Sequence, residues 1–298
     1  MSKSAFPDAK RVLVVYKKST YQVLMRARKH QTLMQLVEAG DADALRVIQA
    51  HKDHVDTLQF AQDLCKRLAI KASFRYRCDA QSAEGCDLVM SLGGDGTLLW
   101  ASHFVGSQVP VLAVNSAPGA SVGYFCVADR HSLESQLQAA LAGRLPELKL
   151  NRMQIMRDGE VMTQRVLNDV LFCHRVPAAT SHYMIDNGHV EEKQTSSGIW
   201  IGPAAGSTAA LRSAGGQVLP LDSQALQFVV REPYQPHGHS YTLVRRLIEA
   251  GGMVRIRSLM DAGQLFIDGS HRVAQVDIGS ELVMRSSKEP LTILGLKA

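Results

Sequence analysis

The stretch Cys86-Asp87-Leu88-Val89-Met90-Ser91-Leu92-Gly93-Gly94-Asp95-Gly96-Thr97 decides the fold of the first half of this chain. Residues 86–92 form a short apolar run, which predicts a buried strand. The glycines that follow predict a sharp turn, and residues 97–103 then predict the start of a helix. A strand, a glycine-rich turn and a helix in this order are typical of a phosphate-binding site in an α/β protein.

The glycines and the helix explain how such a loop binds phosphate. Glycine has no Cβ, so backbone N–H groups can approach phosphate oxygens closely. The following helix adds N–H groups without partners and the positive end of its dipole. We therefore expect phosphate contacts, as in an ATP site, at Gly93, Gly94, Gly96 and Thr97. The loop matches neither G-x-x-x-x-G-K-[ST] nor G-x-G-x-x-G, so neither a P-loop NTPase nor a dinucleotide-binding dehydrogenase is indicated.

Asp95 is the residue of this loop that a simple phosphate cradle does not explain, because a carboxylate repels phosphates. It suits phosphoryl transfer to an alcohol, where a carboxylate accepts the proton of the attacking hydroxyl, orients that hydroxyl or binds Mg²⁺. The alternative is a tight strand-to-helix turn in which Asp95 has an ordinary turn role.

Strand and helix patterns alternate through residues 1–127, which predicts an α/β domain with a doubly wound, mostly parallel sheet. Strand-like segments dominate afterwards, which predicts a β-rich second domain at residues 128–279. We expect strands at 11–16, 72–76, 86–92, 109–114, 165–173, 182–186, 198–201, 254–257, 265–267 and 282–285, helices within 20–70 and at 97–103 and 130–142, and a loop at 231–240.

The composition is that of an ordinary globular protein, with 298 residues, 46% hydrophobic and 20% charged. The formal net charge of +5 comes from short basic clusters, which do not form a nucleic-acid-binding arm. This mild positive charge fits an anionic small molecule but is equally compatible with no special partner.

The cysteines and the lengths of the apolar runs indicate the cellular compartment in which we expect the protein. The chain has five cysteines and no C-x-x-C pair, which argues against a disulfide framework or a zinc site and indicates a reducing compartment. No window approaches the length of a membrane span, and residues 1–8 have no features of a targeting segment, so we expect a cytoplasmic protein.

Several motifs together point to a family. Gly93–Thr97 resembles the G-G-D-G-[TS] signature of a kinase superfamily that includes NAD kinases, diacylglycerol and sphingosine kinases and phosphofructokinases. Val166-Leu167-Asn168-Asp169-Val170 resembles the A-L-N-[ED]-V segment of NAD kinases, and Gly206–Gly216 resembles their G-S-T-A-Y-S-L-S-A-G-G segment. Further resemblances, in the same order, are Val114-Asn115, Gln235-Pro236-His237 and Ile267-Asp268-Gly269.

The chain departs from the commonest NAD kinase pattern in several places. Residues 116–125 are longer than the usual segment after the G-V-N motif, and Ser196-Ser197-Gly198 replaces an Asp-Gly pair. Ala205 replaces a threonine, and Ala210 replaces a tyrosine that could stack on a ring. The long segment, the Ser-Ser-Gly triplet and residues 14–21 resemble the mitochondrial-type branch of the family.

The resemblance implies an NAD kinase, which transfers the terminal phosphate of ATP, with Mg²⁺, to the 2′-hydroxyl of the adenosine ribose of NAD. Inorganic polyphosphate is an alternative donor. Asp95 is then the catalytic residue. The expected NAD-binding residues are Asp95, Gly96, Asn115, Asn168, Asp169, Ser197, Gly206, Ser207, Thr208, Ala210 and Ser213.

The family also implies a homodimer or homotetramer, and a last strand or two at 280–298 that returns to the first domain. We predict no metal site built by the protein, because Mg²⁺ usually arrives with the nucleotide phosphates. The pairs His51/His54 and His237/His239 have no third ligand in sight. A lipid kinase and a non-catalytic nucleotide sensor on the same fold remain as alternatives.

Overall fold

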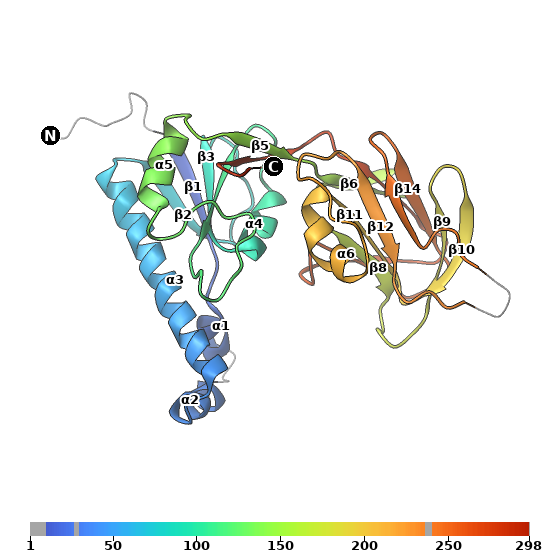
Figure 1. Ribbon diagram of the computed structural model, residues 1–298, viewed down its shortest axis with the longest axis horizontal. Coiled ribbons are helices and arrows are strands. Elements are labelled where there is room, and N and C mark those ends of the chain that lie inside the picture. Colours follow the sequence, from blue (N-terminus) through green and yellow to red (C-terminus); the bar gives the residue numbers. More distant parts are fainter. Residues whose placement is uncertain (1–9, 27–29, 236–239, 298) are drawn as a thin grey trace. The chain divides into compact units, whose positions relative to one another are not determined.

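The computed structural model describes residues 10–26, 30–235 and 240–297. The chain divides into two compact units (Figure 1). The first consists of Met1–Leu148 and Thr292–Lys297, and the second of Lys149–Leu291. Within the described ranges, no helix has the length and apolar character needed to cross a membrane.

The first unit contains a six-stranded sheet in the order β2-β1-β3-β4-β18-β5. The pairs β1–β2, β1–β3, β3–β4 and β4–β18 are parallel, as alternating strands and helices predict. The elements are β1 (Arg11–Tyr16), α1 (Thr20–Arg26), α2 (His30–Glu38), α3 (Ala42–Arg67), β2 (Lys71–Tyr76), β3 (Leu88–Gly93), α4 (Asp95–Ser102), β4 (Val111–Asn115), α5 (Leu133–Leu141), β5 (Glu147–Leu150) and β18 (Leu291–Leu294).

Helices cover both faces of this sheet. Every residue of β3 is buried, which is typical of a central parallel strand. Alternate β3 residues Leu88, Met90 and Leu92 share a core cluster with residues of α3 and α5. Helix α4 contacts β3 and β1 but adds no residue to that cluster, so we infer that it covers the opposite face.

The parallel pairing brings the carboxyl ends of three strands to one edge of the sheet. Leu92 of β3 lies opposite Tyr16 of β1, and Gly93 lies opposite Asn115 of β4. The residues that follow these strands therefore meet at the edge where α/β proteins bind their ligands.

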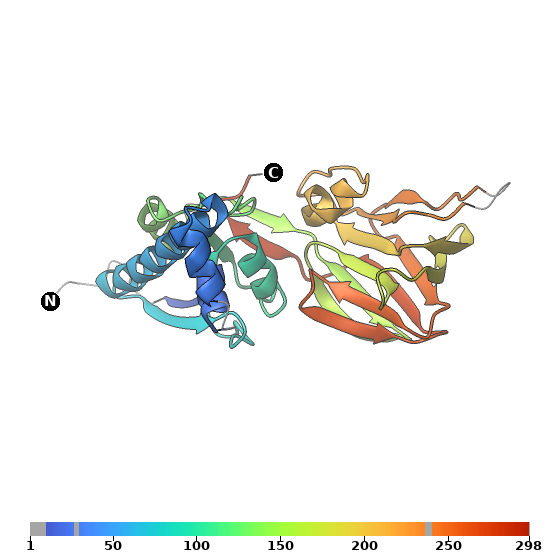
Figure 2. The same ribbon diagram turned by 90° about the horizontal axis from the view of Figure 1, so that it is seen from below.

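The second unit is a β-sandwich. Two six-stranded sheets, β10-β9-β14-β17-β6-β7 and β13-β12-β11-β8-β15-β16, share one hydrophobic core and form two layers in Figure 2. The elements are β6 (Met153–Arg157), β7 (Glu160–Val166), β8 (Val170–His174), β9 (Ser181–Asp186), β10 (Glu191–Ser196), β11 (Ile199–Pro203), the 3₁₀ helix η1 (Ala204–Thr208), α6 (Ala210–Ser213), β12 (Leu226–Val230), β13 (Arg245–Ile248), β14 (Met253–Ser258), β15 (Gly263–Ile267), β16 (Arg272–Val276) and β17 (Glu281–Ser286).

The domain boundaries differ from the expected 1–127 and 128–279. The first unit extends to Leu148, because Leu133 and Leu137 of α5 belong to its core. Only Thr292–Lys297 returns to it, since β17 pairs with β6 and β14 of the sandwich. Helix α5 therefore belongs to the first unit and not, as expected, to the second, and strand β17 belongs to the second unit and not to the first.

One expected strand is also corrected. Residues 165–173 do not form a single strand, because β7 ends at Val166 and β8 begins at Val170. The backbone N–H groups of Leu167, Asn168 and Asp169 donate to the carboxylate of Asp268 instead of to a neighbouring strand. Of the expected loop at 231–240, residues 236–239 lie outside the described part of the chain, and so does most of the Gln235-Pro236-His237 motif.

Candidate functional site

The glycine-rich loop lies between β3 and α4, as its sequence predicts. Gly94 caps the helix with extended backbone and no side-chain hydrogen bond, so no side chain competes for the first N–H groups of α4. Helix α4 begins at Asp95, two residues earlier than expected. The loop therefore presents a helix N-terminus, whose first N–H groups generally lack partners within the helix, at the carboxyl edge of the sheet.

The glycines of this loop serve different purposes. A Cβ on Gly93 would overlap the hydroxyl of Thr97, and a Cβ on Gly94 would lie 2.6 Å from Oγ of Ser121. Packing thus disfavours a side chain at Gly93, whereas one at Gly94 would require the Ser121 hydroxyl to move. A Cβ on Gly96 would meet nothing within 4 Å, and Gly96 is exposed. The missing side chain at Gly96 therefore leaves room for a ligand.

The Thr97 side chain is buried, and its hydroxyl makes no hydrogen bond within the described fold. Its side chain is only 1% exposed, and its Oγ1 has no hydrogen-bond partner among the described residues. A buried hydroxyl without a partner is costly, so its presence indicates a ligand or a water molecule. Gly93, Gly94, Gly96 and Thr97 thus form a site suited to phosphate oxygens.

Asp95 is bonded to the long segment that follows β4. Its Oδ2 accepts a hydrogen bond from the backbone N–H of Tyr124 at 2.9 Å, and its Oδ1 accepts one from Phe125 at 3.0 Å. The side chain remains partly exposed. Asp95 therefore has a structural function that the sequence did not indicate, and each carboxylate oxygen still has a second lone pair to offer.

Asn115 shapes the same segment. Its Nδ2 donates to the carbonyl of Ser121 at 3.0 Å, and its Oδ1 accepts from the N–H of Ala117 at 3.2 Å. A Cβ on Gly123, which has a φ of +62°, would overlap the Asn115 amide. Asn115 is buried and holds this loop in place, so its expected contact with NAD stays a prediction.

His54 and Ser116 join this loop to β1. The Nδ1 of His54 lies 2.8 Å from the Ser116 hydroxyl, and its Nε2 lies 2.8 Å from the carbonyl of Lys17. Burial lowers the pKa of His54 to about 4, so the ring is neutral and Nε2–H donates to the carbonyl. This network fixes the backbone at the ends of β1 and β4.

The histidine pairs do not form metal sites in the described regions. His51 bonds to the hydroxyl of Ser19 and stacks on Tyr21, while His54 is engaged as above. His237 and His239 lie outside the described residues. No group of three or more His, Cys, Asp or Glu side chains suited to a metal ion occurs among the described residues. The expectation that the protein builds no metal site stays a prediction.

In the second unit, Asn168 and Asp169 lie in the turn between β7 and β8. The carboxylate of Asp268 accepts three hydrogen bonds from successive N–H groups of this turn, at 2.7 to 3.2 Å. Within the described chain, Oδ1 of Asn168 is buried without a partner, and the neighbouring Asp169 is only 6% exposed. The turn therefore holds an unused acceptor at Asn168 beside the buried carboxyl of Asp169, and a ribose diol or an amino group suits such a pair.

The electrostatics of this turn are unusual. Burial, and then the charge of Asp268, raise the pKa of Asp169 from its ordinary value to about 7. A buried carboxyl with a raised pKa binds a proton more readily, and the neutral form costs less free energy to bury than the charged form. A ligand that donates a hydrogen bond to Asp169 favours the ionised form.

We expect Asp169→Asn to stabilise the protein more at pH 8 than at pH 5. Because the pKa of Asp169 is raised on folding, the free energy of unfolding falls as the pH rises from the ordinary aspartate pKa to about 7. Asparagine does not titrate, so the variant lacks this loss. Thermal unfolding at both pH values measures it, with the exposed Asp261→Asn as control. Equal melting-temperature differences at the two pH values would contradict the assignment.

The Gly206–Thr208 segment packs directly on this turn. A Cβ on Gly206 would overlap the carbonyl group of Asn168, so glycine is required there. The Ser207 hydroxyl accepts a hydrogen bond from the N–H of Leu219 at 3.0 Å and is fully buried. Ser207 therefore acts as a structural residue here, while Thr208 remains partly exposed. The NAD contacts expected at these three residues stay predictions.

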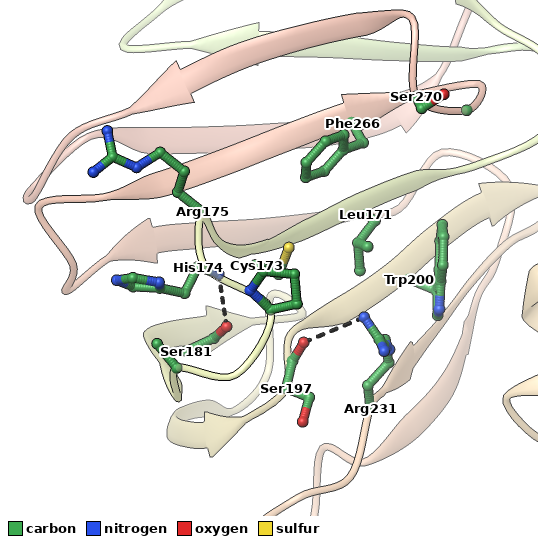
Figure 3. A pocket seen from close by; sticks show the side chains of 13 residues that line it. Leu171, Cys173, His174, Arg175, Ser181, Ser197, Trp200, Arg231, Phe266 and Ser270 are labelled. Carbon is green, nitrogen blue, oxygen red and sulfur yellow. Dashed lines mark hydrogen bonds between the residues drawn. The ribbon is translucent and has the colours of Figure 1, made fainter. Parts of the chain in front are cut away.

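Ser197 lines a cavity of about 290 Å³ in the sandwich unit (Figure 3). Its walls are apolar and aromatic, with Leu171, Trp200 and Phe266, and its basic residues include Arg175 and Arg231. Among the described residues that line it, none carries a carboxylate. The side chain of Arg231 lies over the Trp200 ring, 6.0 Å from its centre, and donates to the Ser197 carbonyl at 3.5 Å. This chemistry suits a flat ring that carries an anionic group.

Ala210 and Ser213 line a separate, more open hollow of about 470 Å³. Trp200 and Arg231 also line this hollow, so they join it to the cavity at Ser197. The structure thus brings Ser197, Ala210 and Ser213 around one Trp–Arg pair. With alanine at position 210, the hollow has no phenol ring at this point.

Sequence reasoning missed several residues of these sites. In the sequence, Asp268 stands out only as part of an Asp-Gly motif. Its hydrogen bonds to the N–H groups of residues 167–169 join positions about a hundred residues apart, which no local pattern indicates. Trp200 and Arg231 belong to no motif. A lone Trp in an apolar strand followed by an Arg at the end of the paired strand was the available signal.

Comparisons with known proteins agree with one another. A family model described as the ATP-NAD kinase N-terminal domain matches residues 3–145. A probable NADH kinase from Oryza sativa subsp. japonica is 32% identical over 264 residues, which cover 81% of this chain and 81% of the relative. An NAD kinase from Teredinibacter turnerae is 34% identical over 184 residues, which cover 60% of this chain and 59% of the relative.

Among solved structures, an NAD kinase from Archaeoglobus fulgidus in complex with ATP superposes with a TM-score of 0.66. It is 19% identical, and the alignment covers 95% of this chain and 92% of that structure. At this level of identity the likeness shows that the two chains share a fold. It spans both the α/β unit and the β-rich unit, as the sequence predicted.

Proposed function

This chain belongs to the NAD kinase family and is a phosphotransferase; from that premise we propose that it transfers the terminal phosphate of ATP to the 2′-hydroxyl of the adenosine ribose of NAD, which gives NADP. The first unit handles the donor phosphates and the proton, and the second unit binds NAD. Inorganic polyphosphate remains an alternative donor.

The observation that carries this proposal is a set of buried polar groups without partners in both units. In the part of the chain that the structure describes, Thr97 Oγ1 and Asn168 Oδ1 have no hydrogen-bond partner. The fold leaves a donor hydroxyl at the glycine loop and an acceptor, Asn168 Oδ1, at the β7–β8 turn. Phosphate oxygens satisfy the first, and the ribose and adenine groups of NAD satisfy the second.

Asp95 has the catalytic role in this proposal. The 2′-oxygen forms a bond to the terminal phosphorus, the bond from that phosphorus to the bridging oxygen breaks, and ADP leaves. The proton of the 2′-hydroxyl passes to Asp95. A carboxylate is a weak base toward an alcohol, so orienting the hydroxyl and accepting the proton late in the transfer suit it as well as early deprotonation.

The N–H bonds to Asp95 support this role. Tyr124 and Phe125 each donate to one carboxylate oxygen, which fixes the orientation of the plane of the carboxylate. A fixed acceptor positions a hydroxyl without the entropic cost of ordering a free side chain. The second lone pair on either oxygen is the one that would take the proton.

Mg²⁺ is expected to accompany the donor. Near the glycine loop, Asp95 is the carboxylate that the motif supplies, and the described residues hold no metal-binding cluster. This donor set fits an ion that keeps its waters and binds mainly to phosphate oxygens. The charge of the bound ion would neutralise part of the charge of the phosphates.

The compartment and assembly belong to the same proposal. All five cysteines are free, which supports a reducing compartment such as the cytoplasm. A homodimer or homotetramer is expected from the family resemblance, and sedimentation of the purified protein measures this state.

The assay that tests the function incubates the purified protein with ATP, Mg²⁺ and either NAD or NADH. We expect formation of NADP or NADPH, read by a dehydrogenase that accepts only the phosphorylated cofactor. Labelled phosphate on a lipid alcohol without NADP would favour a lipid kinase. Tight nucleotide binding without any turnover would favour a nucleotide sensor. Tripolyphosphate in place of ATP decides between the two donors.

A further inference from the structure

Lys17 follows β1 at the carboxyl edge of the sheet and lies against the glycine loop. A Cβ built on Gly93 would have Lys17 Cδ at 3.4 Å, next to the Thr97 hydroxyl. The lysine side chain and the unpartnered hydroxyl therefore border the same space beside Gly93. The bond from His54 to the Lys17 carbonyl fixes the backbone from which this side chain extends.

Among the described residues, Lys17 has no counter-ion for its charge. In the described chain, no carboxylate forms an ion pair with Lys17, although its side chain is partly buried. Its burial, and then the positive charge of Arg77, lower its pKa, which the neighbouring Cys126 partly offsets. An ammonium group held away from water without an anion is unfavourable, so the site lacks a negative partner.

Lys17 lines a cavity of about 270 Å³ within the first unit. The hydroxyl-bearing residues Ser19, Thr20 and Ser121 also line it. Its other charged residues, Arg46 and Asp43, form an ion pair at 3.2 Å, so they largely balance each other. Lys17 thus gives the cavity its positive charge.

The cavity also borders the glycine loop. Ser121, which lines it, would be 2.6 Å from a Cβ on Gly94. Cys126 lies close enough to both Asp95 and Lys17 for their charges to shift its pKa, although burial is the main cause of its rise to about 12. Lys17, Thr97 and Asp95 therefore surround one small region of the first unit.

We propose that Lys17 binds the phosphate chain of the donor at the Gly93–Thr97 loop, where its ammonium group and the Thr97 hydroxyl contact phosphate oxygens. This inference rests on the proposed function, and it names a donor-binding residue outside the glycine motif. A lysine supplies a mobile point charge, which suits phosphate oxygens whose charge changes during transfer. Nucleoside triphosphates and inorganic polyphosphate share this chemistry.

The test compares Lys17→Gln with Lys18→Gln. Lys18 is the neighbouring lysine, and its ammonium lies 4.1 Å from the centre of the Tyr76 ring, away from the cavity lining. Lys17→Gln is expected to raise KM for ATP and to lower kcat, each by about tenfold or more, because it removes a charged hydrogen-bond donor. KM for NAD should stay unchanged. Lys18→Gln should match the wild type, and Lys17→Arg should recover part of the loss.

A binding measurement separates this inference from the proposed function. The melting temperature of the wild type should rise with ATP and with tripolyphosphate, and that of Lys17→Gln should rise much less with either. A rise with ATP alone would assign the contact to nucleotides. A folded Lys17→Gln variant with normal KM for ATP, normal kcat and a normal rise would overturn the inference. A wild type that binds tripolyphosphate through Lys17 without making NADP would overturn only the function.

Discussion

Asp95→Asn is expected to lower the turnover number by at least roughly a hundredfold, the range found when a positioned acid–base group is removed. Asparagine has almost the same shape but cannot accept the proton of the 2′-hydroxyl. Steady-state formation of NADP from ATP and NAD measures the loss. Near-normal turnover in a folded variant would rule out the role that we assign to Asp95.

The hydrogen bonds to Asp95 complicate the interpretation of this variant. The carboxylate accepts N–H groups from both Tyr124 and Phe125, whereas an asparagine amide accepts only with its oxygen. Its NH₂ group would face one of these donors, which loosens residues 124–125. A loss of turnover can therefore come from chemistry or from a displaced loop.

Binding measurements separate the two causes. If only chemistry is lost, the dissociation constants of ATP and NAD and the melting temperature stay close to those of the wild type. If the loop is displaced, binding of at least one nucleotide weakens as well. Asp87→Asn offers a control, since Asp87 also accepts a backbone N–H bond, from Arg11 at 2.7 Å, but lies at the opposite end of β3. This control should retain normal turnover.

The α/β unit follows from its sequence because its signals are local. Short apolar runs with β-branched residues, such as Arg11–Tyr16, became buried parallel strands, and the polar-faced stretch between them became helices. The glycine loop was also predictable, since a strand, glycines and a helix follow one another directly. Burial on both faces of β3 requires no long-range information beyond this alternation.

The parts that the sequence did not predict depend on distant contacts. Residues 165–173 have a strand-like composition. However, three of their backbone N–H groups donate to the Asp268 carboxylate and not to a neighbouring strand, so the chain turns at Asn168. The position of Lys17 beside Gly93 likewise depends on the pairing of β1 with β3. Neither relation leaves a local pattern, because each joins residues about 80 to 100 positions apart.

Gly206→Ala is expected to be the most disruptive single change in the second unit. The new Cβ would overlap the carbonyl oxygen of Asn168 and lie 2.8 Å from its Cα. Main-chain atoms can yield only if the turn moves, and Asp268 holds this turn by three hydrogen bonds. Relief of the overlap therefore breaks bonds elsewhere, which distinguishes Gly206 from glycines that face flexible side chains.

The expected cost is at the upper end of overpacking effects, about 3 kcal/mol, which corresponds to a fall in melting temperature of about 6–12 °C. Because Asn168 is displaced, KM for NAD should rise about tenfold or more, which corresponds to the free energy of one or two lost hydrogen bonds. KM for ATP should stay near normal. Gly119→Ala is the matched control, since a Cβ there meets nothing within 4 Å. Thermal unfolding and the NADP assay measure both effects. A Gly206→Ala protein as stable as Gly119→Ala and with unchanged KM for NAD would show that Asn168 neither contacts Gly206 tightly nor binds NAD.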